Sequence, residues 1–213
     1  EAGARLALSS SPQLPASGES LLSPNGVGHL TISGSADDLV SATIESLGGL
    51  DVVVNAADLR AAGPFERLTD DAWDQLVAVN LTGPVHLFRA AGREMLARGG
   101  GRLVQVVSML GERGVPQTAA YGATQAGLLQ LIRALSLEWA RSSIRINGLG
   151  VGWLEGDPFL GDEPPERLLR YLPTRRLGRP DEVGPLAVYL ASTAADMMTG
   201  QTLWVDGAAM SHA

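Results

Sequence analysis

Two hydroxyl side chains and one amide in the middle of the chain have the types and the spacing for proton chemistry. Ser108 ends a run of β-branched residues, Tyr121 follows thirteen residues later at the start of a helical pattern, and Gln125 comes one helical turn after Tyr121. Residues four apart lie on one face of a helix, so Tyr121 and Gln125 should point the same way. Because tyrosine serves as a general acid or base in active sites, we take this cluster as the candidate active site.

The composition argues against several other kinds of site. The chain has no cysteine, which excludes disulfides, thiolate metal ligands and a cysteine nucleophile. Its three histidines, His29, His86 and His212, lack metal-ligand spacing, so we expect no metal site. The net charge of −7 argues against nucleic acid or an anionic membrane surface as the main partner. No run approaches the roughly 18 apolar residues of a membrane helix, and no secretory signal opens the chain; we expect a cytoplasmic protein.

Predicted strands and helices alternate along the chain. Runs rich in aliphatic and β-branched residues predict strands at 5–9, 29–33, 51–55, 102–108, 144–149 and 202–205. Helical periods lie at 37–47, 70–97, 119–140 and 181–190, with an interruption of the second at 79–83. Most strand runs are apolar on both faces, as in strands buried between helix layers. The alternation predicts a single α/β domain over residues 1–213, with a doubly wound parallel sheet of the Rossmann type.

The beginning of the chain departs from the usual order of a nucleotide-binding unit. Residues 1–4 look like the end of a helix, and residues 5–9 look like the strand that follows it. A βαβ nucleotide-binding unit has an earlier strand and a Gly-rich turn ahead of that helix. Neither is found before residue 5, which is consistent either with a truncated protein or with a start omitted because it is disordered.

Motifs in a fixed order resemble the short-chain dehydrogenase/reductase family over nearly the whole chain. They are Asn55-Ala56-Ala57 at a strand end, Asn80, Ser108, Tyr121, the strand segment Ile144-Arg145-Ile146-Asn147, Gly152-Trp153-Leu154, the stretch 176–183 and the stretch 199–207. Each motif alone is weak, but their order and spacing together are specific. The resemblance implies a Rossmann-type fold and hydride transfer between NAD or NADP and a small carbonyl or alcohol substrate.

The resemblance also implies roles for the candidate active-site residues. Ser108 would hydrogen-bond the substrate oxygen, Tyr121 would be the general acid or base, and Asn80 would hold a water in a proton relay. Position 125 would carry a lysine that grips the nicotinamide ribose and lowers the tyrosine pKa. Gln125 can do part of the first task but not the second. We therefore expect the Tyr121 pKa to stay at about 10. This impairs alcohol oxidation, which needs the phenolate, more than carbonyl reduction, which needs the phenol.

The glutamine at position 125 can be accounted for in two ways. All 16 basic residues are arginine, so a drift in base composition that removed every lysine is one of them. Loss or change of function is the other, and we favour it because a catalytic lysine should resist such drift.

The positions that the resemblance assigns to the cofactor also depart from the family pattern. They are Ser10, Thr31, Asn55, Ala56, Ala57, Gly152 and Leu154. Ser10 and Thr31 stand where aspartates commonly hold the adenosine part of NAD. Asp58 replaces a glycine, and its charge would oppose a bound pyrophosphate. A weak or lost dinucleotide site is as consistent with these changes as an intact one, and they indicate no preference between NAD and NADP.

Two functions remain open after these observations. The leading one is NAD(P)-linked carbonyl–alcohol oxidoreduction by Ser108 and Tyr121, with an impaired proton relay. The alternative is a catalytically inactive or non-redox protein that keeps the fold as an assembly subunit or binds another ligand, since fold alone does not decide function.

Two surface features lead to further expectations. The helical segments 70–97 and 119–140 carry more apolar residues than one sheet face should bury, and we expect a homodimer or homotetramer paired through them. The residues in question are Trp73, Leu76, Leu87, Leu128, Leu131, Leu135 and Trp139. Arg175, Arg176 and Arg179 are expected to be surface ion-pair partners rather than a phosphate site.

Overall fold

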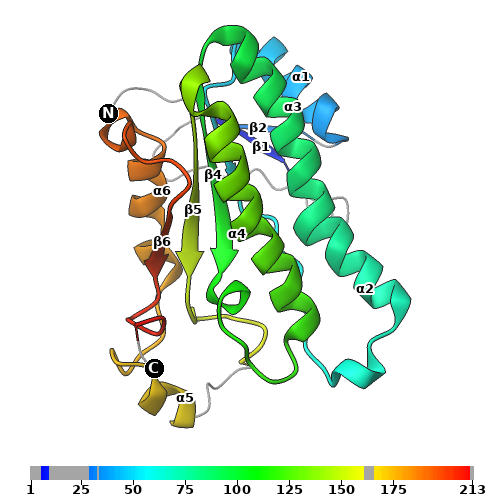
Figure 1. Cartoon of the computed structure of the whole chain (residues 1–213), viewed down its shortest axis with the longest axis vertical. Helices are drawn as coiled ribbons and strands as arrows, with labels where there is room; N and C mark the ends of the chain where they lie inside the picture. The colour runs from blue at the N-terminus through cyan, green and yellow to red at the C-terminus, as the bar shows by residue number, and fades with distance from the viewer. Residues whose placement is uncertain (1–5, 10–28, 33, 161–165, 212–213) are drawn as a thin grey trace.

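The sheet of the computed structural model is parallel throughout. The structure describes residues 6–9, 29–32, 34–160 and 166–211. Within these residues the strands are β1 (Leu6–Ser9), β2 (His29–Ile32), β3 (Val52–Asn55), β4 (Gly101–Ser108), β5 (Ile144–Val151) and β6 (Thr202–Val205). The last four form one sheet in chain order, while β1 and β2 pair with each other (Figure 1). All six predicted strands are confirmed, with ends that differ by up to two residues.

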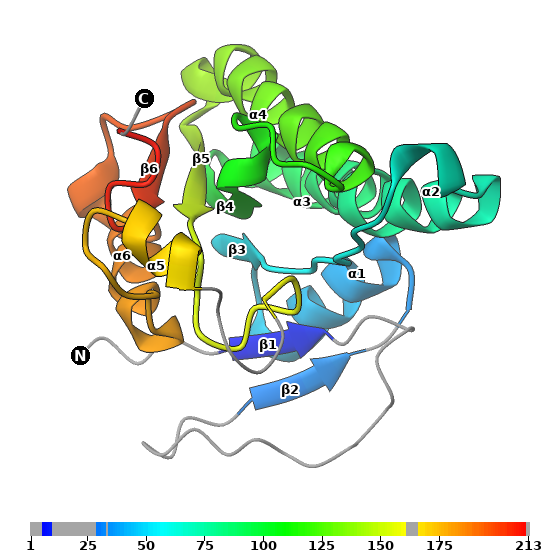
Figure 2. The ribbon, with the colours of Figure 1, turned by 90° about the horizontal axis from the view of Figure 1, so that it is seen from below.

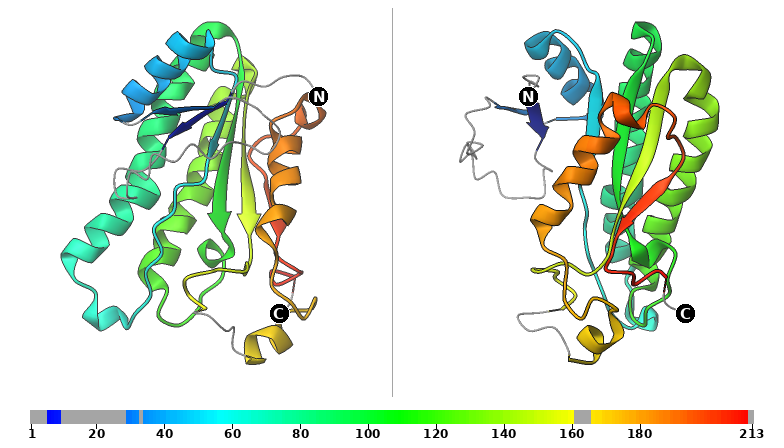
Figure 3. Two further views of the ribbon diagram at one scale, coloured as in Figure 1. Left: turned by 180° about the vertical axis from the view of Figure 1, so that it is seen from behind. Right: turned by 90° about the vertical axis from the view of Figure 1, so that its left-hand side faces the viewer.

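Helices cover both faces of the four-stranded sheet, which confirms the predicted α/β class. They are α1 (Ala36–Leu47), α2 (Asp70–Val77), α3 (Gly83–Arg98), α4 (Ala119–Trp139), α5 (Glu166–Tyr171) and α6 (Gly184–Leu190). Figures 2 and 3 show α3 and α4 on one face and α6 on the other. The short α5 was not predicted, and the segment 70–97 consists of α2 and α3, which are separated at the predicted interruption.

The core consists of apolar layers on the two faces of the central strands. Leu103 of β4 and Ile146 of β5 pack with Phe88 and Ile132 beneath α3 and α4. On the opposite face, Val104, Leu149 and Leu190 pack beneath α6. Because successive side chains of a strand point to opposite faces, both β4 and β5 need apolar residues at consecutive positions.

Strand β3 is an exception to the burial predicted for the strands. Val53 packs into the layer beneath α3 and α4, but Val52 and Val54 are 37% and 48% exposed. Among the described residues, therefore, no helix covers the outer face of β3. The prediction of burial on both faces is wrong for this strand.

The interruption predicted at 79–83 is a π-helical turn at Ala78–Thr82 between α2 and α3. Such a turn inserts one residue into the helical repeat and often occurs at functional sites. Here it contains Asn80, whose side chain is fully buried. The turn thus allows a polar residue to point inward from an otherwise amphipathic helix.

Candidate active site

The candidate site lies at the carboxyl ends of the strands, where β4 leads into α4. Ser108 is the last residue of β4, and a short turn at Met109–Gly111 follows it. This turn passes so close to α4 that a Cβ at Gly111 or Gly122 would lie 2.8 Å from backbone atoms of the other element. Glycine at these two positions therefore permits the approach that brings Ser108 beside Tyr121 and Gln125.

Gln125 joins the end of β4 to the loop after β3. Its Oε1 accepts the backbone N–H of Ser108 at 3.0 Å, and its Nε2 donates to Asp58 Oδ1 at 3.1 Å. The side chain is buried in α4. Gln125 is thus a neutral bridge, where the resemblance to the family implies a cation.

Asp58 is the residue that connects the site. Its Oδ2 accepts the Tyr121 hydroxyl proton at 2.8 Å, while its Oδ1 accepts from Gln125. The sequence motifs predict this carboxylate near a cofactor pyrophosphate, and they give no indication of its contact with Tyr121. The missed signal was its position after β3, because the carboxyl ends of neighbouring parallel strands meet at one edge of the sheet.

A second carboxylate and a guanidinium complete the cluster. Arg60 donates from Nε to Asp58 Oδ2 at 2.8 Å and forms an ion pair with Asp157, whose side chain is only 2% exposed. The Arg60 guanidinium lies 6.0 Å from the centre of the Tyr121 ring and 5.7 Å from that of Phe159. The two rings meet edge to face at 5.2 Å. Two carboxylates therefore share one guanidinium, which leaves an excess of one negative charge.

This environment raises the pKa of Tyr121 well above its ordinary value. Burial is the main cause, and the charge of Asp58 adds to it. Arg60 and a hydrogen bond with Ser108 act in the opposite direction but do not cancel the rise. The expectation of an ordinary tyrosine pKa was therefore wrong, because it considered the missing lysine but not the carboxylate beside the phenol. The Tyr121 side chain remains a neutral phenol at physiological pH.

Asn80 holds the loop after β3 in place. Its Oδ1 accepts the N–H of Leu59 at 2.7 Å, and its Nδ2 donates to the carbonyl of the same residue at 2.8 Å. A longer bond of 3.3 Å leads from Nδ2 to Thr124 Oγ1. Because Leu59 adjoins Asp58, Asn80 fixes the backbone that presents the carboxylate to Tyr121. Its expected role as a water ligand in a relay stays a prediction.

The candidate cofactor residues lie at the same edge of the sheet where the structure describes them. Asn55 ends β3 with its side chain donating to Gln105 at 2.8 Å, and Ala56 and Ala57 that follow are exposed. Gly152 continues β5, and its N–H donates to the Val205 carbonyl at 3.1 Å. Leu154 forms a parallel bridge with Gly178. Ser10 lies outside the described residues, and for Thr31 only the backbone in β2 is described.

These residues fit the nicotinamide end of a dinucleotide cofactor. Ala56 and Ala57 are exposed and directly precede Asp58, which accepts the Tyr121 hydroxyl proton. The amide nitrogen of Gln125 carries two hydrogens and uses one for Asp58, so the other can donate to a ribose hydroxyl. Against this fit stands the excess negative charge of the cluster, which opposes an anionic cofactor.

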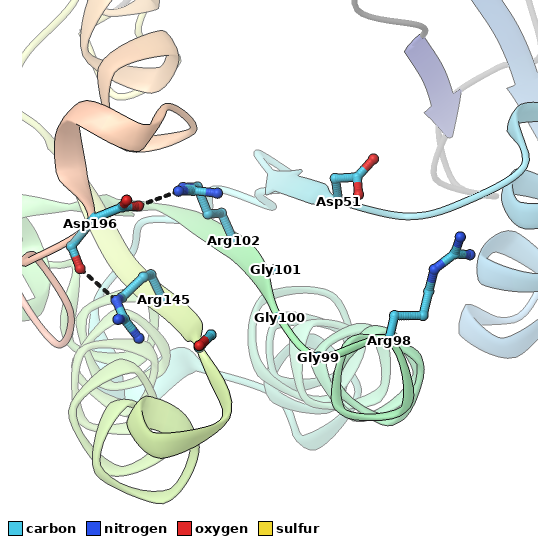
Figure 4. Close-up of a pocket in the computed structure, with 9 residues that line it drawn as sticks. Asp51, Arg98, Gly99, Gly100, Gly101, Arg102, Arg145 and Asp196 are labelled. Atoms are coloured by element: carbon cyan, nitrogen blue, oxygen red, sulfur yellow. Dashed lines mark hydrogen bonds and ion pairs between the residues drawn. The ribbon is translucent and has the colours of Figure 1, made fainter.

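A separate hollow lies at the opposite end of the strands. Its volume is about 430 Å³, and it is lined by Asp51, Arg98, Gly99, Gly100, Gly101, Arg102, Ser143, Arg145 and Asp196. Figure 4 shows Arg102 and Arg145 both directed at Asp196. Arg98 in turn pairs with Glu94 and donates to the Gly48 carbonyl at 3.0 Å. Since these arginines already have partners, we assign no function to this hollow.

Surface ion pairs account for the arginine-rich stretch near the C-terminal helix. Arg176 donates to both oxygens of Glu182 at 2.8 Å, and Arg179 pairs with Asp181 at 3.0 Å. The pKa of Glu182 is lowered to about 2, mainly because its carboxylate accepts hydrogen bonds from Arg176. The ion-pair expectation is confirmed for Arg176 and Arg179. For Arg175 the structure shows a bond to the Arg170 carbonyl.

The described residues contain neither a candidate metal cluster nor a candidate membrane-spanning helix. They contain no group of three histidine or acidic side chains placed to hold a metal ion. No helix in the described part of the chain is both long enough and apolar enough to cross a membrane.

The fold and the Ser108–Tyr121 pair together define the class of protein. A family model described as enoyl-(acyl carrier protein) reductase matches residues 27–208. The chain belongs to the short-chain dehydrogenase/reductase family of oxidoreductases, as the sequence motifs predicted.

Curated relatives within this family act on different substrates. Nodulation protein G of Rhizobium sp. (strain N33) is 36% identical over 76% of this chain and 66% of its own length. D-threitol dehydrogenase of Mycolicibacterium smegmatis is 33% identical over 81% of this chain and 66% of its own length. The 3-oxoacyl-acyl-carrier-protein reductase of Vibrio cholerae is 31% identical over 87% of this chain and 78% of its own length. The chain thus spans about two thirds to three quarters of the length of these relatives.

Solved structures show the same fold. A gluconate 5-dehydrogenase from Burkholderia cenocepacia J2315, solved in complex with NADP and tartrate, superposes with a TM-score of 0.84 at 30% identity. The match covers 89% of this chain and 78% of that one.

Proposed function

We propose that this chain is the catalytic unit of an NAD(P)-linked oxidoreductase that interconverts a carbonyl and an alcohol, and that it favours the reductive direction. The observation that carries this proposal is the buried Tyr121 phenol beside Ser108, at the carboxyl edge of a family-typical sheet. A bound nicotinamide would supply or accept the hydride. The gluconate 5-dehydrogenase neighbour was solved in complex with NADP.

The chain's own residues would bind and protonate the substrate oxygen. Ser108 donates to that oxygen, and Tyr121 gives its proton to the developing alkoxide. Tyr121 can do so only when its hydroxyl turns from Asp58, and Arg60 already holds the carboxylate that is left behind. Asn80 keeps the loop with Asp58 in place and, in this proposal, holds the water that returns a proton to Tyr121.

The raised pKa of Tyr121 determines the direction. Alcohol oxidation begins with a phenolate that removes the alcohol proton, and the site keeps Tyr121 as the neutral phenol. Carbonyl reduction begins with the phenol, which is abundant. The contact with Asp58 also makes Tyr121 a weaker acid. The proposed proton relay is therefore slower than one with a lysine at position 125.

One observation favours the alternative of a non-redox family member. The Tyr121 hydroxyl already donates its proton to Asp58, whereas a carbonyl substrate would need that donor. A site that carries out no proton transfer would tolerate this contact.

Consumption of NADH or NADPH with a panel of small ketones and hydroxyketones separates the two functions. The proposed oxidoreductase oxidises one of the cofactors with some member of the panel. This rate falls by about a hundredfold or more in Ser108→Ala and Tyr121→Phe, in line with the usual contribution of general acid–base groups. Cofactor turnover that is unchanged in both variants contradicts the assignment, and the absence of turnover in the parent favours the non-redox alternative.

A further inference from the structure

The hydrogen-bond polarity of Tyr121 suits a ligand that donates rather than one that accepts. Its only proton goes to Asp58 at 2.8 Å. A phenol has one donor, so what remains for a ligand is a lone pair. A carbonyl oxygen is itself an acceptor and finds no partner on Tyr121 until Asp58 is displaced.

The charge around Tyr121 favours the same kind of ligand. Asp58 and Asp157 share Arg60, which leaves an excess of one negative charge around side chains that are 25%, 2% and 18% exposed. Partial burial strengthens such a field because water screens it less. A cation that approaches Asp58 is therefore attracted, whereas a developing alkoxide is repelled.

The two aromatic rings beside Asp58 already face a cation of the chain itself, the Arg60 guanidinium. The Tyr121 and Phe159 rings meet edge to face at 5.2 Å, and the Arg60 guanidinium lies within 6.0 Å of both ring centres. Aromatic faces attract cations at such distances. The rings are thus already in contact with one positive group next to the carboxylate.

We propose that this site binds protonated cyclic amines and the corresponding iminium ions, and that it prefers them to carbonyl compounds and alcohols of the same shape. The N–H of the ligand donates to Asp58 and to the Tyr121 oxygen, and its charge offsets the excess carboxylate. This inference rests on the proposed oxidoreductase function and adds a second substrate class to it.

The chemistry balances without a proton from the protein. In the reductive direction a hydride, supplied by the reduced nicotinamide dinucleotide of the proposed function, forms the new C–H bond at the iminium carbon. The two electrons of the C=N π bond become the lone pair of the amine nitrogen, and solvent then protonates the amine. The weak acidity of Tyr121, which slows carbonyl reduction, is irrelevant to this reaction.

Binding of matched ligands tests the inference without turnover. The probes are 1,2,3,4-tetrahydroisoquinoline, a cation at neutral pH, and isochroman, the neutral ether of the same shape, each titrated by calorimetry. We expect the amine to bind at least about tenfold more tightly, as a charge-assisted hydrogen bond implies. Asp58→Asn should remove this preference, and Asp181→Asn, which neutralises a carboxylate paired with Arg179, should keep it. Equal affinity, no binding of the amine, or a preference that survives in Asp58→Asn overturns the inference.

Turnover of matched substrates separates this inference from the proposed function. The comparison is 3,4-dihydroisoquinoline against the ketone 1-tetralone, with NADH and with NADPH. We expect faster reduction of the imine. In Tyr121→Phe we expect ketone reduction to fall at least about tenfold more than imine reduction, because the ketone loses its proton donor whereas the imine loses one acceptor and keeps Asp58. If the ketone alone is reduced, or if both rates fall equally in Tyr121→Phe, this inference is overturned and the proposed function stands. If neither compound is reduced and neither cofactor binds, both are overturned.

Discussion

The hydroxyl of Tyr121 donates its proton to the carboxylate of Asp58 at 2.8 Å, and Gln125 donates to the other oxygen of that carboxylate at 3.1 Å. The tyrosine of the candidate active site therefore has an anion as its neighbour. The resemblance to the family implies a lysine cation at position 125, so the electrostatic influence on the phenol is reversed. The carboxylate disfavours the phenolate form of Tyr121, whereas a lysine would favour it.

Neutralising Asp58 should lower the pKa of Tyr121. Burial and the Asp58 charge raise it, so Asp58→Asn removes the second cause and leaves the first. Tyrosinate absorbance during an alkaline titration reports the change, with Tyr121→Phe identifying the contribution of Tyr121 among the three tyrosines. A Tyr121 signal that titrates at the same pH in the parent and in Asp58→Asn would show that the carboxylate has no influence.

The same titration has a consequence for stability. The pKa of the phenol is higher in the folded than in the unfolded state. Its contribution to the free energy of unfolding is therefore constant below about pH 10, and this stability is lost as the pH rises further. The alkaline loss of stability should therefore be smaller in Tyr121→Phe than in the parent.

Removing the Asp58 carboxylate should tighten cofactor binding. We predict that the parent binds NADH and NADPH weakly and with little preference, because the cluster has an excess negative charge and the cofactors are anions. Asp58→Gly should improve the affinity by about tenfold, which corresponds to about 1.4 kcal/mol. Calorimetry with both cofactors measures this, with Asp181→Asn as the matched control. Tight and selective binding by the parent would be the contrary result.

Arg60 should be important for stability. Arg60→Gln leaves the buried Asp157 and the half-buried Asp58 without their shared counter-ion. Breaking a largely buried ion pair from one side costs about 3 kcal/mol or more, whereas an exposed pair contributes at most about 1 kcal/mol. Urea unfolding should therefore show a large decrease for Arg60→Gln and a small one for Arg179→Gln, whose ion pair is exposed. Similar decreases for the two variants would argue against this role.

The helical layer is the expected assembly surface, though with less apolar area than the sequence suggested. Leu76 and Leu128 are buried within the chain's own core, and Leu87, Leu131, Leu135 and Trp139 pack partly against it. Among the described residues of these helices, the exposed large apolar side chains are Trp73 (38%), Val85 (36%), Leu96 (44%) and Leu137 (84%). We still predict a homodimer or homotetramer through α2, α3 and α4. Light scattering at micromolar concentration should show it, and Leu137→Glu should weaken it; a monomeric parent would refute the prediction.

The sequence predicted the fold well because strand runs and helical periods are local signals. The strands that are buried on both faces, β4 and β5, are the clearest examples, since a short run of consecutive apolar residues is typical of a strand between two layers. The exposed valines of β3 could not be foreseen, because burial depends on which helix crosses a strand and not on the strand's own residues.

Three residues of the candidate site were predictable from the sequence, but the residues that connect them were not. Ser108, Tyr121 and Gln125 follow from their spacing around one strand end and one helix. The contacts of Asp58 and Arg60 depend on how the loop after β3 folds back over α4, and Asn80 fixes that loop through Leu59. Phe159 and Asp157 come from a segment about a hundred residues later, and sequence spacing alone does not show that this segment returns to the loop after β3.

The measurement that tests the account most directly is the rate of alcohol oxidation relative to carbonyl reduction, in the parent and in the double variant Asp58→Gly, Gln125→Lys. The double variant replaces the carboxylate beside Tyr121 by a cation, at the cost of the acceptor for the Ser108 N–H. At neutral pH the parent should reduce faster than it oxidises. The double variant should gain at least about tenfold in oxidation and less in reduction, and Tyr121→Phe should abolish both gains. Efficient oxidation by the parent at neutral pH, or a double variant that binds NADH normally and stays inert, would contradict the account.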